Sequence, residues 1–172
     1  MANDLGCGIF LEDIDTVLPW GSEIRELLNI ADPVLQESKD RVRLFWNDHL
    51  IFGGIRSQVE AVFYRDRPDL HDYPNANGNL HIVTLNFDDI DKLEPREKYE
   101  QLKIGFIQAL GMPSFERKVE MTSFERPLTE WDSKHALVVL MLFERFGEYC
   151  IGEIWHKPLP ASRKPKSISK SA

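Results

Sequence analysis

The stretch Pro95–Glu120, PREKYEQLKIGFIQALGMPSFERKVE, predicts a helix, a sharp end and the start of a strand, and the rest of the fold is expected to pack around it. Its apolar residues recur at helical spacing and form one stripe: Tyr99, Leu102, Phe106, Ala109 and Leu110. Pro95 suits the first turn of a helix, because a backbone N–H has no helical partner there. Gly111 can adopt the left-handed conformation that ends a helix, and Pro113 prevents the helix from resuming. We therefore expect one amphipathic helix that ends sharply, with strands packed against it on both sides.

An earlier stretch repeats this pattern of a helix followed by proline. Ser22 can cap a helix over residues 23–30. The apolar stripe of that helix consists of Ile24, Leu27, Leu28 and Ala31. Asp32-Pro33 ends it in the way that Met112-Pro113 ends the later helix. The two regions share a pattern and little sequence identity.

Alternating apolar residues predict strands after the first helix, and apolar runs bounded by turns predict strands after the second. After the first helix, strands are expected over residues 41–46, 58–64 and 80–87, with a break at Gly53-Gly54. After the second, they are expected over 116–121, 135–144 and 149–155, with Trp131 at the edge of a further strand. We predict an α+β fold in which two helix–β–β–β units, residues 15–94 and 95–156, form one antiparallel sheet with both helices on one face.

Length and composition are those of a single folded domain over residues 1–156. No apolar window approaches the roughly 18 residues that a membrane helix needs, so no membrane partner is expected. The first residues lack the basic region and the apolar core of a signal peptide, and we expect a cytoplasmic protein. In that compartment Cys7 and Cys150 are expected to be two unlinked thiols.

Charge is distributed unevenly along the chain. Residues 157–172 contain five of the 21 basic residues and none of the 28 acidic ones, which leaves residues 1–156 with a net charge of −12. An acidic body does not bind nucleic acid by neutralising phosphates, but it attracts a basic protein partner. Residues 157–172 are rich in Pro, Ser and Lys and are predicted to be a disordered tail. This tail is either a solubilising end or a weak contact for an anionic surface.

Motifs of known chemistry are not found. The five histidines show no zinc-binding spacing, and there is no nucleophile elbow, dinucleotide fingerprint or phosphate-binding loop. We therefore predict no catalytic set, no metal and no cofactor. Gly53-Gly54, followed by Arg56, is either a bulge or turn, or a cradle of backbone amides for an anion.

Two groups of acidic residues are the remaining candidates for a binding site. The first is Asp88, Asp89 and Asp91, which precede the helix at Pro95 together with Glu94. They can serve as a solvated loop that favours the helix N-terminus, as a surface for a partner, or as ligands of a hard cation. The second group is Glu12, Asp13 and Asp15, for which the same alternatives hold.

A resemblance to known protein families reduces the number of functions to consider. It rests on Leu18-Pro19-Trp20-Gly21, Phe52-Gly53-Gly54, the strand 80–87, Leu110-Gly111-Met112-Pro113 and Trp131 before a long apolar strand. In this combination the chain resembles cytoplasmic immunity proteins that partner secreted bacterial toxins of the polymorphic, contact-dependent and type VI kinds. Its tandem helix–strand repeat also resembles the small lipoproteins of outer-membrane assembly and tandem-repeat enzyme inhibitors. The sequence differs from those of the lipoproteins in one respect: it shows no cysteine near a cleavage site that could be lipidated.

The resemblance implies an inhibitor that binds a cognate toxin domain and blocks its active site. A basic toxin, such as a nuclease, would complement the acidic body. We expect the acidic loop of Asp88, Asp89 and Asp91 to steer the partner. The expected contact anchors are Trp46, His49 and Phe52. The alternatives are a non-catalytic assembly module, with a homodimer formed through an exposed final strand, or an enzyme whose unusual site uses His81 or His135.

Overall fold

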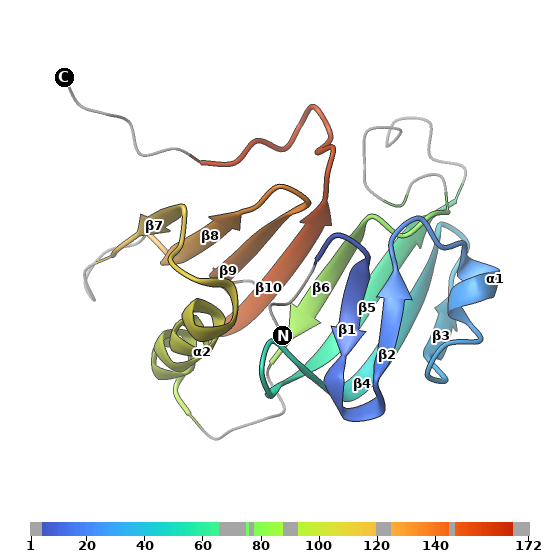
Figure 1. The fold of residues 1–172 in the computed structure, drawn as a ribbon, viewed down its shortest axis with the longest axis horizontal. Helices are drawn as coiled ribbons and strands as arrows, with labels where there is room; N and C mark the ends of the chain where they lie inside the picture. The colour runs from blue at the N-terminus through green and yellow to red at the C-terminus, as the bar shows by residue number, and fades with distance from the viewer. Residues whose placement is uncertain are drawn as a thin grey trace.

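The computed structural model describes residues 5–65, 75, 78–87, 93–119, 125–144 and 147–166. Its elements are β1 (Gly8–Leu11), the 3-10 helix η1 (Glu12–Ile14), β2 (Thr16–Pro19), α1 (Ile24–Leu27), β3 (Val34–Glu37), β4 (Arg41–Ile51), β5 (Ile55–Tyr64), β6 (Ile82–Asn86), α2 (Pro95–Leu110), β7 (Phe115–Arg117), β8 (Leu128–Asp132), β9 (Ala136–Glu144) and β10 (Glu148–His156). The fold is α+β with antiparallel pairing, as predicted, but it is mostly strand, and β1 and β2 form a separate two-stranded sheet (Figure 1).

The main sheet has eight strands in the order β3-β4-β5-β6-β10-β9-β8-β7. Each half is a meander of consecutive strands, and the halves join where β6 pairs with β10. The final strand β10 therefore lies inside the sheet, between β6 and β9, and has no edge to offer a second chain. This corrects the expectation of a homodimer through the final strand, since the edges of the sheet are β3 and β7.

Helix α2 follows its sequence signals closely. It begins at Pro95 and ends at Leu110, before Gly111, whose φ of 86° and ψ of −166° are open to glycine but differ from the expected left-handed helical conformation. Tyr99 and Phe106 of the predicted stripe are buried in the core. The Phe106 ring lies 5.1 Å from that of Phe52 in the first half of the sheet and 5.4 Å from that of Trp131 in the second. Helix α2 therefore packs against both halves.

The first half departs from the predicted helix–strand unit. Helix α1 has only four residues, and among these only Leu27 is buried. It begins with a capping box between Glu23 and Glu26 rather than at Ser22. Ala31 has a positive φ of 56°, which turns the chain toward β3. The β1–β2 hairpin lies over β4, in the place where a helix was expected to pack (Figure 1).

A second apolar cluster lies on the outer face of the sheet, away from α2 and the hairpin. It contains Leu128, Leu137, Val139, Phe115, Met141, Trp155 and Leu159. Leu159 belongs to the segment that the sequence predicts to be a disordered tail. In the same segment, the Arg163 guanidinium lies 5.3 Å from the centre of the Trp155 ring. Residues 157–166 therefore pack on the sheet, and residues 167–172 lie outside the described chain.

The structure also bears on the two cysteines and on membrane-spanning helices. Neither Cys7 nor Cys150 forms a disulfide, as predicted. In the part of the chain that the structure describes, no helix has the length and apolar character needed to cross a membrane.

Candidate functional site

A groove of about 970 Å³ lies between the β1–β2 hairpin and α2. Ile51 and Phe52, at the end of β4, line its floor. The strand β1 forms one wall, and Gln108 and Ala109 of α2 line the other. Its volume lies at the upper end of the range that protein ligand sites usually span.

The floor of the groove is fixed by contacts between segments that are distant in sequence. The Glu12 carboxylate of η1 accepts hydrogen bonds from the backbone N–H groups of Gly53, at 2.7 Å, and Gly54, at 2.8 Å. Both glycines have positive φ, so their amides converge on a single carboxylate. The predicted anion cradle exists, and the anion that it holds is a side chain of the same protein. Arg56 lies outside this cradle and pairs with Asp48 at 2.7 Å.

A second carboxylate of η1 fixes the other side of the turn. Asp13 accepts a hydrogen bond from the Leu50 N–H at 2.9 Å, and its Oδ2 lies 3.0 Å from Nδ1 of His49. Partial burial opposes the effect, but the hydrogen bonds from Leu50 and His49 hold the pKa of Asp13 below its ordinary value. The acidic group at residues 12–15 therefore acts first as a clamp between the hairpin and β4.

The charged side chains that line the groove are all acidic among the described residues. Glu12 and Asp15 are its charged members, and none of the described residues that line it is Lys, Arg or His. Phe10 and Val17, which face each other across the hairpin, are 39% and 37% exposed. An acidic, partly apolar groove is suited to a ligand that combines positive charge with apolar groups.

One edge of β1 is open. The Trp20 N–H donates to the Cys7 carbonyl at 3.1 Å, and the register pairs Gly8 with Pro19 and Phe10 with Val17. In an antiparallel pair the hydrogen-bonded positions alternate, so Gly8 and Phe10 direct their N–H and C=O groups away from β2. Within the described chain, no residue forms a hydrogen bond with these groups.

The structure places the predicted contact residues in different surroundings. Trp46 is only 1% exposed, and its indole N–H donates to the Ile30 carbonyl at 2.8 Å. Phe52 is 5% exposed and serves as groove floor, while the His49 ring is engaged by Asp13. Trp46 is therefore a core residue, with almost no surface for a partner to contact. The predicted steering residues Asp88, Asp89 and Asp91 lie outside the described residues.

Sequence reasoning did not identify the groove, because β1, η1 and α2 meet only through the fold. One signal could have pointed to it. The apolar run Gly8–Leu11 comes directly before the acidic residues Glu12, Asp13 and Asp15, which places apolar and acidic side chains side by side in the sequence.

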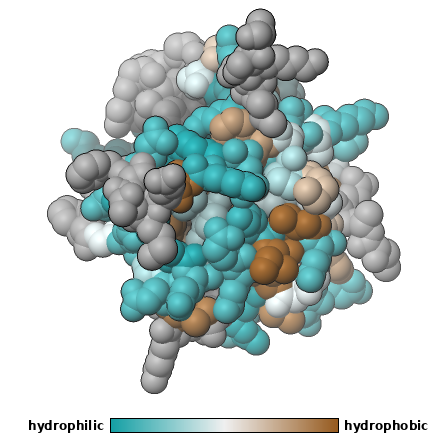
Figure 2. All heavy atoms as spheres, turned by 90° about the vertical axis from the view of Figure 1, so that its left-hand side faces the viewer, coloured by the Kyte–Doolittle hydropathy of each residue, from teal (hydrophilic) through white to brown (hydrophobic). Residues whose placement is uncertain are grey.

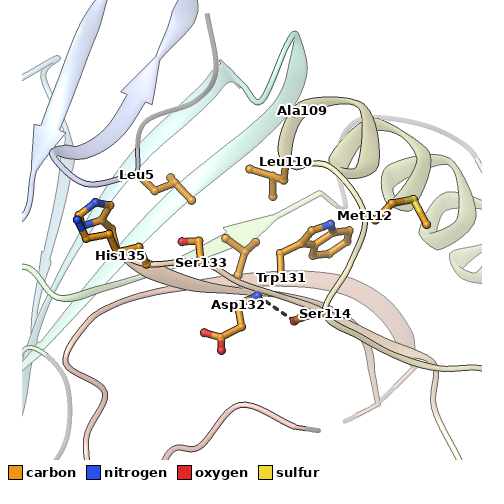
Figure 3. A pocket seen from close by; sticks show the side chains of 11 residues that line it. Leu5, Ala109, Leu110, Met112, Ser114, Trp131, Asp132, Ser133 and His135 are labelled. Carbon is orange, nitrogen blue, oxygen red and sulfur yellow. Dashed lines mark hydrogen bonds between the residues drawn. The ribbon is translucent and has the colours of Figure 1, made fainter. Parts of the chain in front are cut away.

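A second cavity, of about 350 Å³, lies beside the C-terminal end of α2 (Figure 3). Ser133, His135 and Asp132 line it, and these are the residue types of a catalytic triad. The Ser133 hydroxyl donates to the Ala136 carbonyl at 2.8 Å, however, and Asp132 pairs with Lys157 at 2.5 Å. Figure 3 shows the Asp132 carboxylate pointing away from the cavity. These side chains stabilise a turn and are not arranged to relay a proton.

Three histidines, His81, His135 and His156, lie close together at one end of the sheet. The His156 ring is stacked between Trp20, at 5.2 Å, and His81, at 5.9 Å. Burial and then the neighbouring His81 and His135 lower the pKa of His156. Across the described ranges, no three His, Cys, Asp or Glu residues come together in a way that could hold a metal ion.

The side of the molecule that carries α2 and β7 is mostly hydrophilic, with small and separate hydrophobic patches (Figure 2). Among the coloured residues of this view no broad apolar surface is seen, so the groove beside the hairpin is the better candidate for recognition. Comparison of the chain with family models, with curated proteins and with solved structures found no match.

Proposed function

We propose that this protein is a non-catalytic inhibitor, an immunity protein that binds a basic bacterial toxin and blocks its active site. The observation that carries the proposal is the groove, which offers two carboxylates, exposed apolar side chains and an open strand edge. These features suit the recognition of a polypeptide. The resemblance of the sequence to toxin-immunity proteins supplies the class of partner.

The chemistry at the groove favours binding over catalysis. Glu12 is held by two backbone amides, and Asp13 is held by Leu50 and His49. A general base must be free to take a proton from a substrate, whereas a carboxylate held by amides keeps a fixed position and charge. Fixed negative charge is what orients a basic partner.

The net charge supports the same proposal. With −12 on residues 1–156, the protein attracts basic partners over a distance set by the salt concentration. Association with a basic toxin is therefore expected to be fast at low salt. The rate should fall as salt is added, while the dissociation rate changes less.

The test is capture of the tagged full chain from its native cells, followed by mass spectrometry and a reconstitution assay. We expect one secreted-type protein, or its toxic C-terminal fragment, at near-equal stoichiometry, and loss of its toxic activity on mixing. Partner-free protein from cells that express such a toxin would overturn the proposal. So would a complex in which the toxin stays fully active.

One observation favours a second candidate, an assembly module. The edge strand β3 exposes Val34 and Leu35, and among the described residues it pairs with β4 alone. Such an edge can pair with a second copy of the chain. Sedimentation at micromolar concentration separates the two candidates, because the assembly module forms a homo-oligomer without a heterologous partner and the inhibitor does not.

A further inference from the structure

We propose that the groove binds an extended basic segment of the partner, which adds to the open edge of β1 as a third strand of the hairpin sheet. This inference rests on the proposed function, because it assigns to the toxin the segment that is bound. It also names the surface of this chain that recognises the segment and the chemistry of recognition.

The backbone supplies the first part of the argument. Gly8 and Phe10 present two N–H and two C=O groups to the groove side of β1, without a partner in the described chain. Unpaired edge groups inside a hollow are the feature that strand addition uses, since the added strand supplies ladder hydrogen bonds. The hairpin also requires glycine at position 8, where a Cβ atom would lie 2.1 Å from the Leu18 carbonyl oxygen.

The shape of the groove supplies the second part. An extended chain beside β1 would have Ile51 and Phe52 beneath it and Gln108 of α2 on its far side. Side chains of a strand alternate between its faces, so one set can contact this apolar floor while the other lies beside exposed Phe10. The amide of Gln108 can donate to or accept from the outer edge of the added strand.

Charge supplies the third part and selects the occupant. Glu12 and Asp15 are the charged residues of the lining, and the described lining has no cation to balance them. Glu12 uses its carboxylate on the amides of Gly53 and Gly54, and a carboxylate can accept further hydrogen bonds from Lys or Arg. A basic segment therefore fits, and an acidic segment does not.

The basic C-terminal segment of this chain is engaged elsewhere. Arg163 and the backbone of Lys166 lie at Glu130, on the outer face of the sheet, whereas the groove lies on the side of α2 and the hairpin. The partner's segment is thus the occupant that the contacts favour.

The test uses the full chain and a fluorescein-labelled peptide of alternating Lys and Val, with fluorescence anisotropy as the readout. Two matched probes are an alternating Glu–Val peptide and the Lys–Val peptide N-methylated at alternate residues, which cannot form the ladder on that edge. We expect the Lys–Val peptide to bind and the other two to bind at least about tenfold more weakly. Binding should weaken as salt is added.

A pair of variants locates the site. Asp15→Asn should weaken binding of the Lys–Val peptide about threefold, the effect of one exposed charge. Asp32→Asn is the matched control, because Asp32 also has a positive φ, of 44° against 50° for Asp15, and lies outside the groove lining. The control should leave the affinity unchanged, and equal effects of the two substitutions would overturn the location.

Two outcomes overturn strand addition altogether: equal binding of the N-methylated peptide, or no binding of the Lys–Val peptide up to about 1 mM. If the partner is captured and silenced while the peptide does not bind, the inhibitor function holds and the groove is not its contact surface. If the peptide binds as expected but no toxin is captured, the groove assignment holds and the inhibitor function fails. The two proposals therefore fail separately.

Discussion

Two glutamates on the outer face of the sheet, one in each half, are buried by different means. Glu60 of β5 is 8% exposed and Glu130 of β8 is 0% exposed. Glu60 pairs with Arg43 of the neighbouring strand at 2.6 Å and contacts Asn86 of β6 at 3.3 Å. Glu130 instead accepts from the Lys166 N–H at 2.7 Å and lies 3.6 Å from the Arg163 guanidinium. The first half satisfies its carboxylate within the sheet, whereas the second depends on the C-terminal segment.

Glu60 and Glu130 occupy equivalent positions in the cross-strand register of the sheet. Glu60 pairs with Thr84, Thr84 with Glu153, Glu153 with Val139, and Val139 with Glu130, so the two glutamates stand in one row across the sheet. Around Glu60 the sheet carries the polar side chains of Thr84 and Asn86 beside the Phe45 ring, over which the Arg43 guanidinium lies. Around Glu130 it is apolar and covered by Leu159. Residues 157–166 therefore act as part of the second half of the fold.

The largest expected effect comes from deleting residues 157–172. The deletion exposes the outer cluster around Leu137 and Trp155 and removes both partners of Glu130. We expect a loss of about 2–3 kcal/mol in the free energy of unfolding, the value for exposing one large apolar side chain and its neighbours. Urea denaturation followed by tryptophan fluorescence measures it.

A shorter deletion is the control. Removing only residues 167–172 leaves Leu159 and Arg163 in place, and we expect the urea midpoint to stay the same. Equal midpoints for the full chain and the longer deletion would show that the C-terminal segment contributes nothing to the stability of the second half.

A smaller effect is expected from Arg43→Ala. The substitution leaves the Glu60 carboxylate in the sheet, with Asn86 as its remaining hydrogen-bond partner in the described chain. A broken buried ion pair costs about 3–5 kcal/mol, but the Arg43 side chain is 39% exposed, so we expect about 1–2 kcal/mol. The matched variant Arg43→Lys keeps the charge and should recover part of this loss. Thermal unfolding of the three proteins tests the order.

Arg163→Ala should cost less than Arg43→Ala, and this order tests the comparison directly. When Arg163 is lost, the C-terminal segment can lift and let water reach Glu130, whereas the strands around Glu60 cannot separate without unfolding the sheet. We expect about 1 kcal/mol or less in the free energy of unfolding. A larger loss for Arg163→Ala than for Arg43→Ala would mean that the segment is as rigid as a strand.

The parts of the fold that the sequence predicts are those encoded locally. Helix α2 has its start, stripe and stop within 19 residues, from Pro95 to Pro113, and the structure reproduces all three. The strands β4, β5 and β10 follow from local patterns of apolar and polar residues, and β9 follows from an unbroken apolar run of strand length. Trp46 and Trp131 each donate the indole N–H to a carbonyl that follows a helix, Ile30 or Gly111, so the two halves do share this contact.

The parts that the sequence does not predict depend on contacts between distant segments. The carboxylate of Glu12 accepts hydrogen bonds from the amides of Gly53 and Gly54, which are 41 and 42 residues away in sequence, and no local pattern indicates this contact. Residues 157–166 have the composition of a disordered segment, yet Leu159 and Arg163 meet an apolar cluster and a buried carboxylate. The candidate groove escapes prediction for the same reason, because its walls come from β1 and α2.

The smallest expected effect is a dependence of stability on pH at the junction between the two halves. His156 ends β10 beside β6, and burial together with His81 and His135 lowers its folded-state pKa below the ordinary 6.5. A histidine with a lowered pKa binds its proton more readily when unfolded, so stability is lost as pH falls below about 6.5. His156→Phe keeps a ring between Trp20 and His81 and removes the titration, and we expect it to flatten the unfolding free energy between about pH 5 and 7. His49→Phe is the comparison variant in the first half, because His49 faces Asp13 and no other histidine contacts it in the described chain. If urea midpoints measured across this pH range fall equally in the wild type and in His156→Phe, the junction is not the acid-sensitive part of the sheet.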